Sequence, residues 1–147
     1  MDITKAVKED HDQLKSMLDT INSSADAAEI FQTFKQFAAW LGKHSKADKK
    51  VVYDALLATG NDKAEVDAHE EYTERMLADT LLKKLKAGTV PLPAAWRAEA
   101  LAMQEIVEDR IKEEEDTTIG DVKSYFESAE RDEMGETFDK LGLEAAV

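Results

Sequence analysis

Histidine and carboxylate side chains recur in this sequence at a spacing that could bind a metal ion. His44 and Asp48 are four residues apart, so on a helix both project from the same side. Arg110 and Glu114 have the same spacing, so the two pairs look like copies of one pattern in which arginine replaces the histidine of the second copy. The chain contains 3 histidines and no cysteine, so a transition metal would be bound by imidazole, carboxylate or phenol groups. Such ligands suit iron, manganese or zinc.

Turn-forming residues divide the chain into the elements that must position these side chains. The only prolines are Pro91 and Pro93, and the remaining turn signals leave long uninterrupted stretches between them. The pattern predicts four helices and a shorter fifth one, over about 2–21, 25–58, 62–87, 93–127 and 129–141. Helices joined by short loops pack antiparallel. We therefore expect an all-α, up-down-up-down four-helix bundle formed by a single domain over 1–147, with the fifth helix folding back over one end.

Each long helix carries an apolar stripe that polar side chains interrupt. Apolar residues follow one another at spacings of three and four, which is the period of one helical face. The polar members of these stripes are, in chain order, His11, His44, Asp48, His69, Arg110 and Glu114. Burying them is costly unless they pair with one another. We therefore expect them to meet at a common depth inside the bundle.

In the third predicted helix, His69 falls among apolar residues of one face, so we expect it to point inward. Asp62 is expected to cap this helix at its N-terminus. The predicted inward-facing residues are Val66, His69, Thr73, Met76, Leu77, Leu81 and Leu85.

Composition excludes several other classes of function. The formal net charge of −13 would repel a phosphate backbone and an anionic membrane surface, so nucleic acid and membranes are not expected as partners. The N-terminal residues lack the apolar core of a signal peptide, and the apolar runs are too short to span a bilayer. We expect a cytoplasmic protein.

These motifs resemble those of the hemerythrin-like HHE cation-binding family over nearly the whole chain. The segments that carry the resemblance are DHDQL around His11, HSKADKKVVYD from His44, AHEEYTERML around His69, and RIKEEEDTTIG from Arg110. Tyr72, about one turn after His69, is a rival for the position in the third helix.

The resemblance implies a four-helix bundle with a non-haem di-iron centre. One iron would be bound by His11 and His44, the other by His69 and the residue at 110, with Asp48 and Glu114 as bridging carboxylates. An arginine is always protonated and cannot be a ligand. We therefore expect a mononuclear or weakened site, in which the Arg110 cation replaces the missing metal and neutralises the two carboxylates.

Two functions remain open at this stage. The resemblance implies an iron-binding bundle, with manganese or zinc as alternative metals, acting in iron handling, in sensing a small diatomic ligand such as oxygen or nitric oxide, or in redox stress. The alternative is a metal-free descendant of that bundle that acts as an interaction or regulatory module. No catalytic residue is evident, so an enzyme is not expected. Whether the protein forms a homodimer or binds another protein is open.

Overall fold

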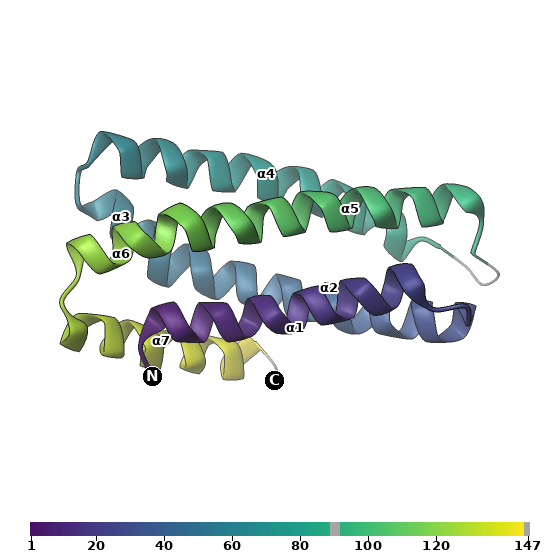
Figure 1. The fold of residues 1–147 in the computed structure, drawn as a ribbon, viewed down its shortest axis with the longest axis horizontal. Coiled ribbons are helices and arrows are strands. Elements are labelled where there is room, and N and C mark those ends of the chain that lie inside the picture. Colours follow the sequence, from purple (N-terminus) through teal and green to yellow (C-terminus); the bar gives the residue numbers. More distant parts are fainter. Residues whose placement is uncertain (89–91, 146–147) are drawn as a thin grey trace.

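The long helices run alternately up and down and are joined by short loops (Figure 1). The computed structural model describes residues 1–88 and 92–145, and within these ranges no strand occurs. The elements are α1 (Ile3–Ser23), α2 (Ala27–Asp48), η1 (Lys49–Tyr53), α3 (Asp54–Ala58), α4 (Asp62–Lys86), α5 (Ala94–Glu113), η2 (Glu114–Thr118), α6 (Ile119–Tyr125) and α7 (Ser128–Ala145). The predicted all-α four-helix bundle with a fifth helix is confirmed; the predicted turn residue Pro91 lies outside the described residues.

Side-chain caps set where the helices begin. The carboxylate of Asp2 accepts a hydrogen bond from the backbone N–H of Thr4 at 2.9 Å, which starts α1. The side-chain oxygen of Asn61 accepts from Ala64 N–H at 3.1 Å and caps α4. The prediction that Asp62 is the cap of α4 is therefore wrong by one residue. Asn61 has the extended backbone of a cap residue, whereas Asp62 already belongs to the helix.

The second and fourth rods of the bundle each contain one π-helical segment. η1 follows directly after Asp48 and joins α2 to α3, and η2 begins at Glu114 and joins α5 to α6. The predicted long helices are thus present, but each is interrupted by a wider turn beside its carboxylate. Such π-helical turns are rare and are frequently found at functional sites.

A layer of polar side chains separates two clusters of the hydrophobic core. One cluster includes Leu14, Leu18, Phe34, Phe37, Trp96 and Met103. The other includes Ile3, Val7, Val52, Tyr53, Leu56 and Val122. Between them lie the buried side chains of His11, His44, Asp48 and Glu114. The apolar clusters on both sides shield this layer from solvent, so its polar atoms must find partners inside the protein.

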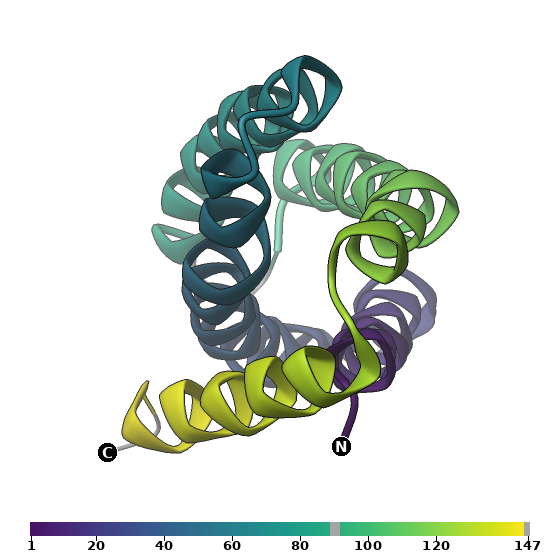
Figure 2. The ribbon, with the colours of Figure 1, turned by 90° about the vertical axis from the view of Figure 1, so that its left-hand side faces the viewer.

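α7 packs on the outside of α1 and α2, near the chain's N-terminus (Figures 1 and 2). It is longer than predicted, and it lies against the sides of these helices rather than across the end of the bundle. The Arg131 guanidinium binds the Asp2 carboxylate at 2.8 Å. A Cβ atom at Gly135 would overlap the backbone carbonyl of Met1, so glycine is needed for this close approach. Phe138 of α7 is buried.

Candidate metal centre

Four of the predicted site residues lie together in the polar layer. His11 is in α1, His44 and Asp48 are in α2, and Glu114 is the first residue of η2. None of the four is more than 6% exposed. The predicted convergence of polar residues from separate helices is therefore confirmed for these four.

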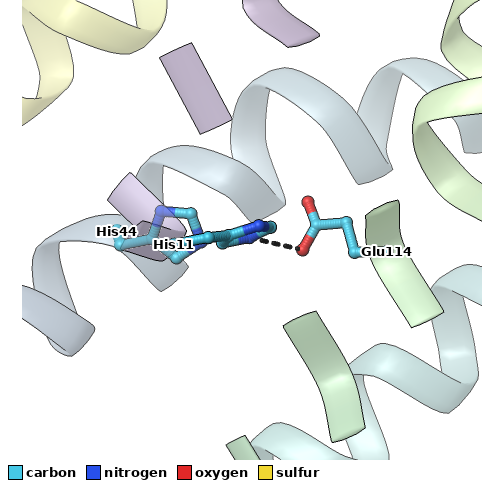
Figure 3. A group of neighbouring side chains, drawn as sticks. All are labelled: His11, His44 and Glu114. Atoms are coloured by element: carbon cyan, nitrogen blue, oxygen red, sulfur yellow. Dashed lines mark ion pairs between the residues drawn. The ribbon is translucent and has the colours of Figure 1, made fainter. Parts of the chain in front are cut away.

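The two imidazole rings and the Glu114 carboxylate point toward a common position (Figure 3). The Nε2 atom of His11 lies 3.4 Å from Glu114 Oε2, and the Nε2 atom of His44 lies 4.0 Å from Asp48 Oδ2. One potential ligand atom each from His11, His44 and Glu114 lies within 4.8 Å of the others. Atoms that share one metal at bond lengths of about 2.0–2.2 Å are at most about 4.4 Å apart. A small contraction would therefore bring all three side chains onto one ion.

Two further carboxylates orient the histidine rings from behind. The Asp10 carboxylate lies 2.9 Å from His44 Nδ1, and the Glu115 carboxylate lies 3.1 Å from His11 Nδ1. A carboxylate accepts a hydrogen bond, so in each ring Nδ1 carries the proton and the Nε2 lone pair is left for a metal. Metal-binding histidines almost always have such a partner. Sequence reasoning missed Asp10 and Glu115, although each is adjacent in sequence to a predicted ligand.

Several buried polar atoms of the centre have no hydrogen-bond partner. Among the described residues, His11 Nε2, Asp48 Oδ1 and Glu114 Oε1 are buried and have no hydrogen-bond partner. Leaving such groups unpaired costs roughly 1–3 kcal/mol each. A metal ion at this position would bind these atoms, so the donors present fit the kind of ion that imidazole and carboxylate ligands prefer.

Burial favours the neutral form of the two central carboxyl groups. Burial raises the pKa of Asp48 well above its usual value, and the nearby Glu114 adds to this effect. Burial and the charge of Glu71 raise the pKa of Glu114 to about 8. Binding a cation would reverse both effects, because a positive charge favours the carboxylate form.

Arg110 lies beside this centre but pairs with a different set of carboxylates from the one predicted. Its guanidinium forms ion pairs with Glu71, with Glu74 at 3.1 Å and with Glu113 at 3.2 Å. It also donates a hydrogen bond to the hydroxyl of Tyr53 at 3.3 Å. Burial alone would lower the pKa of Arg110, but the neighbouring carboxylates more than offset it. Arg110 is a fixed cation that faces carboxylates of α4, and no direct pair with Asp48 or Glu114 occurs in the described ranges.

The prediction that His69 faces the interior is wrong. Its side chain is exposed and lies on the outer face of α4, and Tyr72 donates a hydrogen bond to Asp54 at 3.0 Å instead of pointing to the centre. The residue of α4 that approaches the centre is Glu71, which pairs with Arg110 and lines the cavity beside His11 and Glu114. His69 and Tyr72 are therefore not part of the cluster that the structure assembles.

A second group of carboxylates, Glu70, Glu74 and Glu113, is close enough together to attract a cation. Two of its members already pair with the Arg110 guanidinium. The guanidinium of Arg110 therefore already neutralises part of the negative charge of this group.

A cavity of about 50 Å³ leads from the centre toward the surface between α2 and α4. This volume suits one or two water-sized molecules. His11, His44 and Glu114 line its inner part, and the exposed Asp79 belongs to its outer part. Arg75 also lines it and donates a hydrogen bond from Nη1 to the backbone oxygen of Ser45 at 3.0 Å, which ties α4 to α2 at this opening.

Fold and site together define a helical bundle with a buried histidine–glutamate group that could hold a metal ion. The hemerythrin HHE cation binding domain matches residues 2–120 of the chain. The chain belongs to this family, as the sequence motifs predict, and α7 lies beyond the matched residues.

A protein named DNA nickase from Nostoc sp. (strain PCC 7120) is 23% identical over 138 residues, which cover 94% of this chain and 38% of the relative. The chain thus spans well under half the length of this relative. No solved structure matches the chain significantly.

Proposed function

We propose that this protein binds one iron ion through His11, His44 and Glu114, with Asp48 beside them. The observation that carries the proposal is the inward direction of both histidine Nε2 atoms, each set by a carboxylate on Nδ1. A histidine that serves only as a core residue would pair both ring nitrogens, whereas His11 Nε2 is buried and has no hydrogen-bond partner. Membership of a cation-binding family supports the same conclusion.

A single ion is proposed because Arg110 occupies the region where a second ion would need ligands. Its guanidinium already neutralises Glu71 and Glu74 of α4, so a second cation there would meet a fixed positive charge. The side chains that α4 places near Arg110 are carboxylates. Its histidine, His69, faces outward and cannot serve as a ligand there.

The proposed role is iron handling, redox stress or the sensing of a small diatomic ligand. Iron supplies reversible redox chemistry and affinity for such ligands, and the small cavity beside His11 gives a molecule of that size a route inward. Manganese or zinc would suit the same ligands. Among the described residues, no nucleophile or acid–base pair outside the metal cluster supports catalysis, so we propose a binding protein rather than an enzyme, and the cytoplasm remains its predicted location.

A metal-free interaction module is the second candidate. It is favoured by the Arg110 cluster, in which a guanidinium already balances carboxylates that face the bundle interior. The nicking activity named for the relative is not extended to this chain, because a net charge of −13 opposes contact with a phosphate backbone.

Elemental analysis separates the two candidates. The protein is expressed in medium supplemented with iron, manganese or zinc, purified without chelator and compared with a chelator-treated sample. Iron binding predicts about one ion per chain, together with a rise in the unfolding temperature over the chelated protein. Less than a tenth of an ion per chain under all three conditions would overturn the metal proposal and leave the interaction module.

The carboxylates behind the histidines yield a separate prediction. Asp10→Asn and Glu115→Gln each weaken the hydrogen bond that fixes a ring, so each variant is expected to bind iron about 10- to 100-fold more weakly. Competition with a colourimetric chelator measures the affinity. The exposed neighbours provide matched controls, since Asp12→Asn and Asp116→Gln change a similar charge without touching a ring. Equal loss of affinity in variant and control would mean that only overall charge matters.

Replacing Arg110 tests why the site holds one ion. Arg110→His removes the guanidinium and adds an imidazole near Glu71, so iron content is expected to rise from about one toward two ions per chain. Arg110→Gln, which removes the charge without adding a ligand, should stay near one. If Arg110→His unfolds the protein while metal content per folded chain is unchanged, Arg110 acts only as a structural counter-ion.

A further inference from the structure

Helix α4 has apolar side chains on two opposite faces. Its inner face packs into the bundle through Ala64, Ala68, Ala78, Leu82 and Leu85. Its outer face exposes Val66, Met76 and Leu77, with exposed fractions of 64%, 62% and 53%. Large apolar side chains that line up on a water-facing helix commonly mark an interaction surface.

The exposed residues form one continuous stripe along the helix. Val66, His69, Thr73, Met76 and Leu77 follow at spacings of three and four, and all of them are exposed. We call this set the outer stripe. A shallow hollow lined by Val66, His69 and Thr73 lies over its first half. α7 packs against α1 and α2 on the opposite side of the bundle and leaves the outer stripe uncovered (Figure 2).

Charges beside the outer stripe are divided between the two halves of the helix. Exposed acidic residues of the first half are Asp62, Glu65 and Glu70. Exposed basic residues of the second half are Lys83, Lys84 and Lys86, and Asp79 is the exposed acidic residue of that half. The one exposed lysine of the first half, Lys63, is already paired with Asp67 at 3.0 Å and Asp121 at 3.5 Å. The exposed face of α4 is therefore acidic at one end, apolar in the middle and basic at the other end.

We propose that the outer stripe of α4 binds the same stripe of a second copy of this chain, with the two helices antiparallel. A two-fold axis near Thr73 brings the acidic half of each helix against the basic half of the other. Asp62 and Lys84 lie at equal distances in sequence from Thr73 and would face one another across the axis. A parallel arrangement would instead place like charges together, which is unfavourable.

The area of the outer stripe limits the affinity that we expect for the dimer. A helix of 25 residues is roughly 37 Å long at a rise of about 1.5 Å per residue. One face of it offers less than the roughly 800 Å² per partner that a stable interface buries. Interfaces below this size are commonly weak and transient, so we expect a dissociation constant on the order of 10–100 μM. Lys84 already pairs with Glu99 of α5 at 3.4 Å, so Asp62 of a second copy would share this ammonium group with Glu99, which also limits the affinity.

Sedimentation equilibrium across a concentration series tests the proposal. A chain of 16.4 kDa is expected to approach about twice that mass at several hundred micromolar. Leu77→Asp places a charge in the middle of the outer stripe and should give a monomer at every concentration. Leu101→Asp is the matched control, because Leu101 of α5 is similarly exposed, at 56%, but lies outside the stripe, and this variant should dimerise normally.

A charge exchange distinguishes the antiparallel arrangement from general apolar contact. Lys83→Glu with Lys84→Glu should weaken the dimer at least about tenfold, and adding Asp62→Lys with Glu65→Lys should restore it, because the pairs are then reversed. Restoration supports the proposed pairing. A monomeric parent chain throughout the series, equal effects of Leu77→Asp and Leu101→Asp, or failure of the charge exchange to restore association would each overturn the proposal. Measurements with and without iron keep this result separate from the metal proposal.

Discussion

His11→Ala is expected to reduce bound iron from about one ion per chain to less than a tenth of one. The change removes one of the three proposed ligand atoms, the His11 Nε2 that lies 3.4 Å from the Glu114 carboxylate. Two ligand atoms remain, and a site with fewer protein ligands binds a metal ion more weakly. The measurement is iron content after loading with ferrous iron and removal of unbound metal.

His69→Ala is the matched control for this variant. It removes the same type of side chain from an exposed position on α4, away from the polar layer. It should keep the iron content of the parent chain. A loss of iron in His69→Ala comparable to that in His11→Ala would show that the buried cluster is not the binding site. Circular dichroism of both variants verifies that each remains helical.

Raising the pH from 5 to 8 is expected to destabilise the metal-free protein by a few kcal/mol, and iron should abolish most of this loss. The pKa of Glu114 is about 8 in the folded protein and 4.5 in the unfolded reference. Between these values the unfolded chain has released the proton while the folded protein still holds it. The folded state thus binds more protons, and its free energy of unfolding falls as the pH rises through this window.

Buried Asp48 changes stability in the same direction, because burial also raises its pKa. The parent chain and Glu114→Gln are compared by urea unfolding at pH 5 and pH 8, after treatment with chelator. Glu114→Gln should show a clearly smaller decrease, since glutamine does not ionise. A parent chain whose stability is flat or rises over this range would contradict the burial of a neutral carboxyl pair.

The sequence predicted the helices well because their signals are local. The 3.6-residue period and the turn residues locate the rods of the bundle to within a few residues, as in α1 and α4. The π-helical segments were not predicted. One follows directly after Asp48 and the other begins at Glu114, and no local composition marks them.

Helix α4 shows how a periodic pattern can select the wrong face. Val66, Met76 and Leu77 form the stronger hydrophobic signal, yet they face water. The inner face has the same spacing but is built largely from alanines, such as Ala64 and Ala78, whose hydrophobic signal is weak. Small residues allow α4 to approach its neighbours closely. A search for apolar residues at helical spacing that counted alanine equally with larger side chains would have found this face, and Glu71 with it.

The candidate site was predictable where side chains interrupt a strong stripe, as His11, His44 and Glu114 do. The ion pairs of Arg110 with Glu71 and Glu74 were not, because these two residues belong to α4, whose orientation was predicted wrongly. Asp10, next to His11, was not predicted as a site residue, although its carboxylate lies against His44 of the neighbouring helix. Contacts between helices depend on rotation about each helix axis, which periodicity fixes only approximately.

An anomalous-difference map from crystals of the iron-loaded protein tests the central claim most directly. We predict one strong peak, about 2.0–2.3 Å from the Nε2 atoms of His11 and His44 and from a carboxylate oxygen of Glu114. A peak at Glu70, Glu74 and Glu113 instead, or no peak in protein that carries iron in solution, would contradict it.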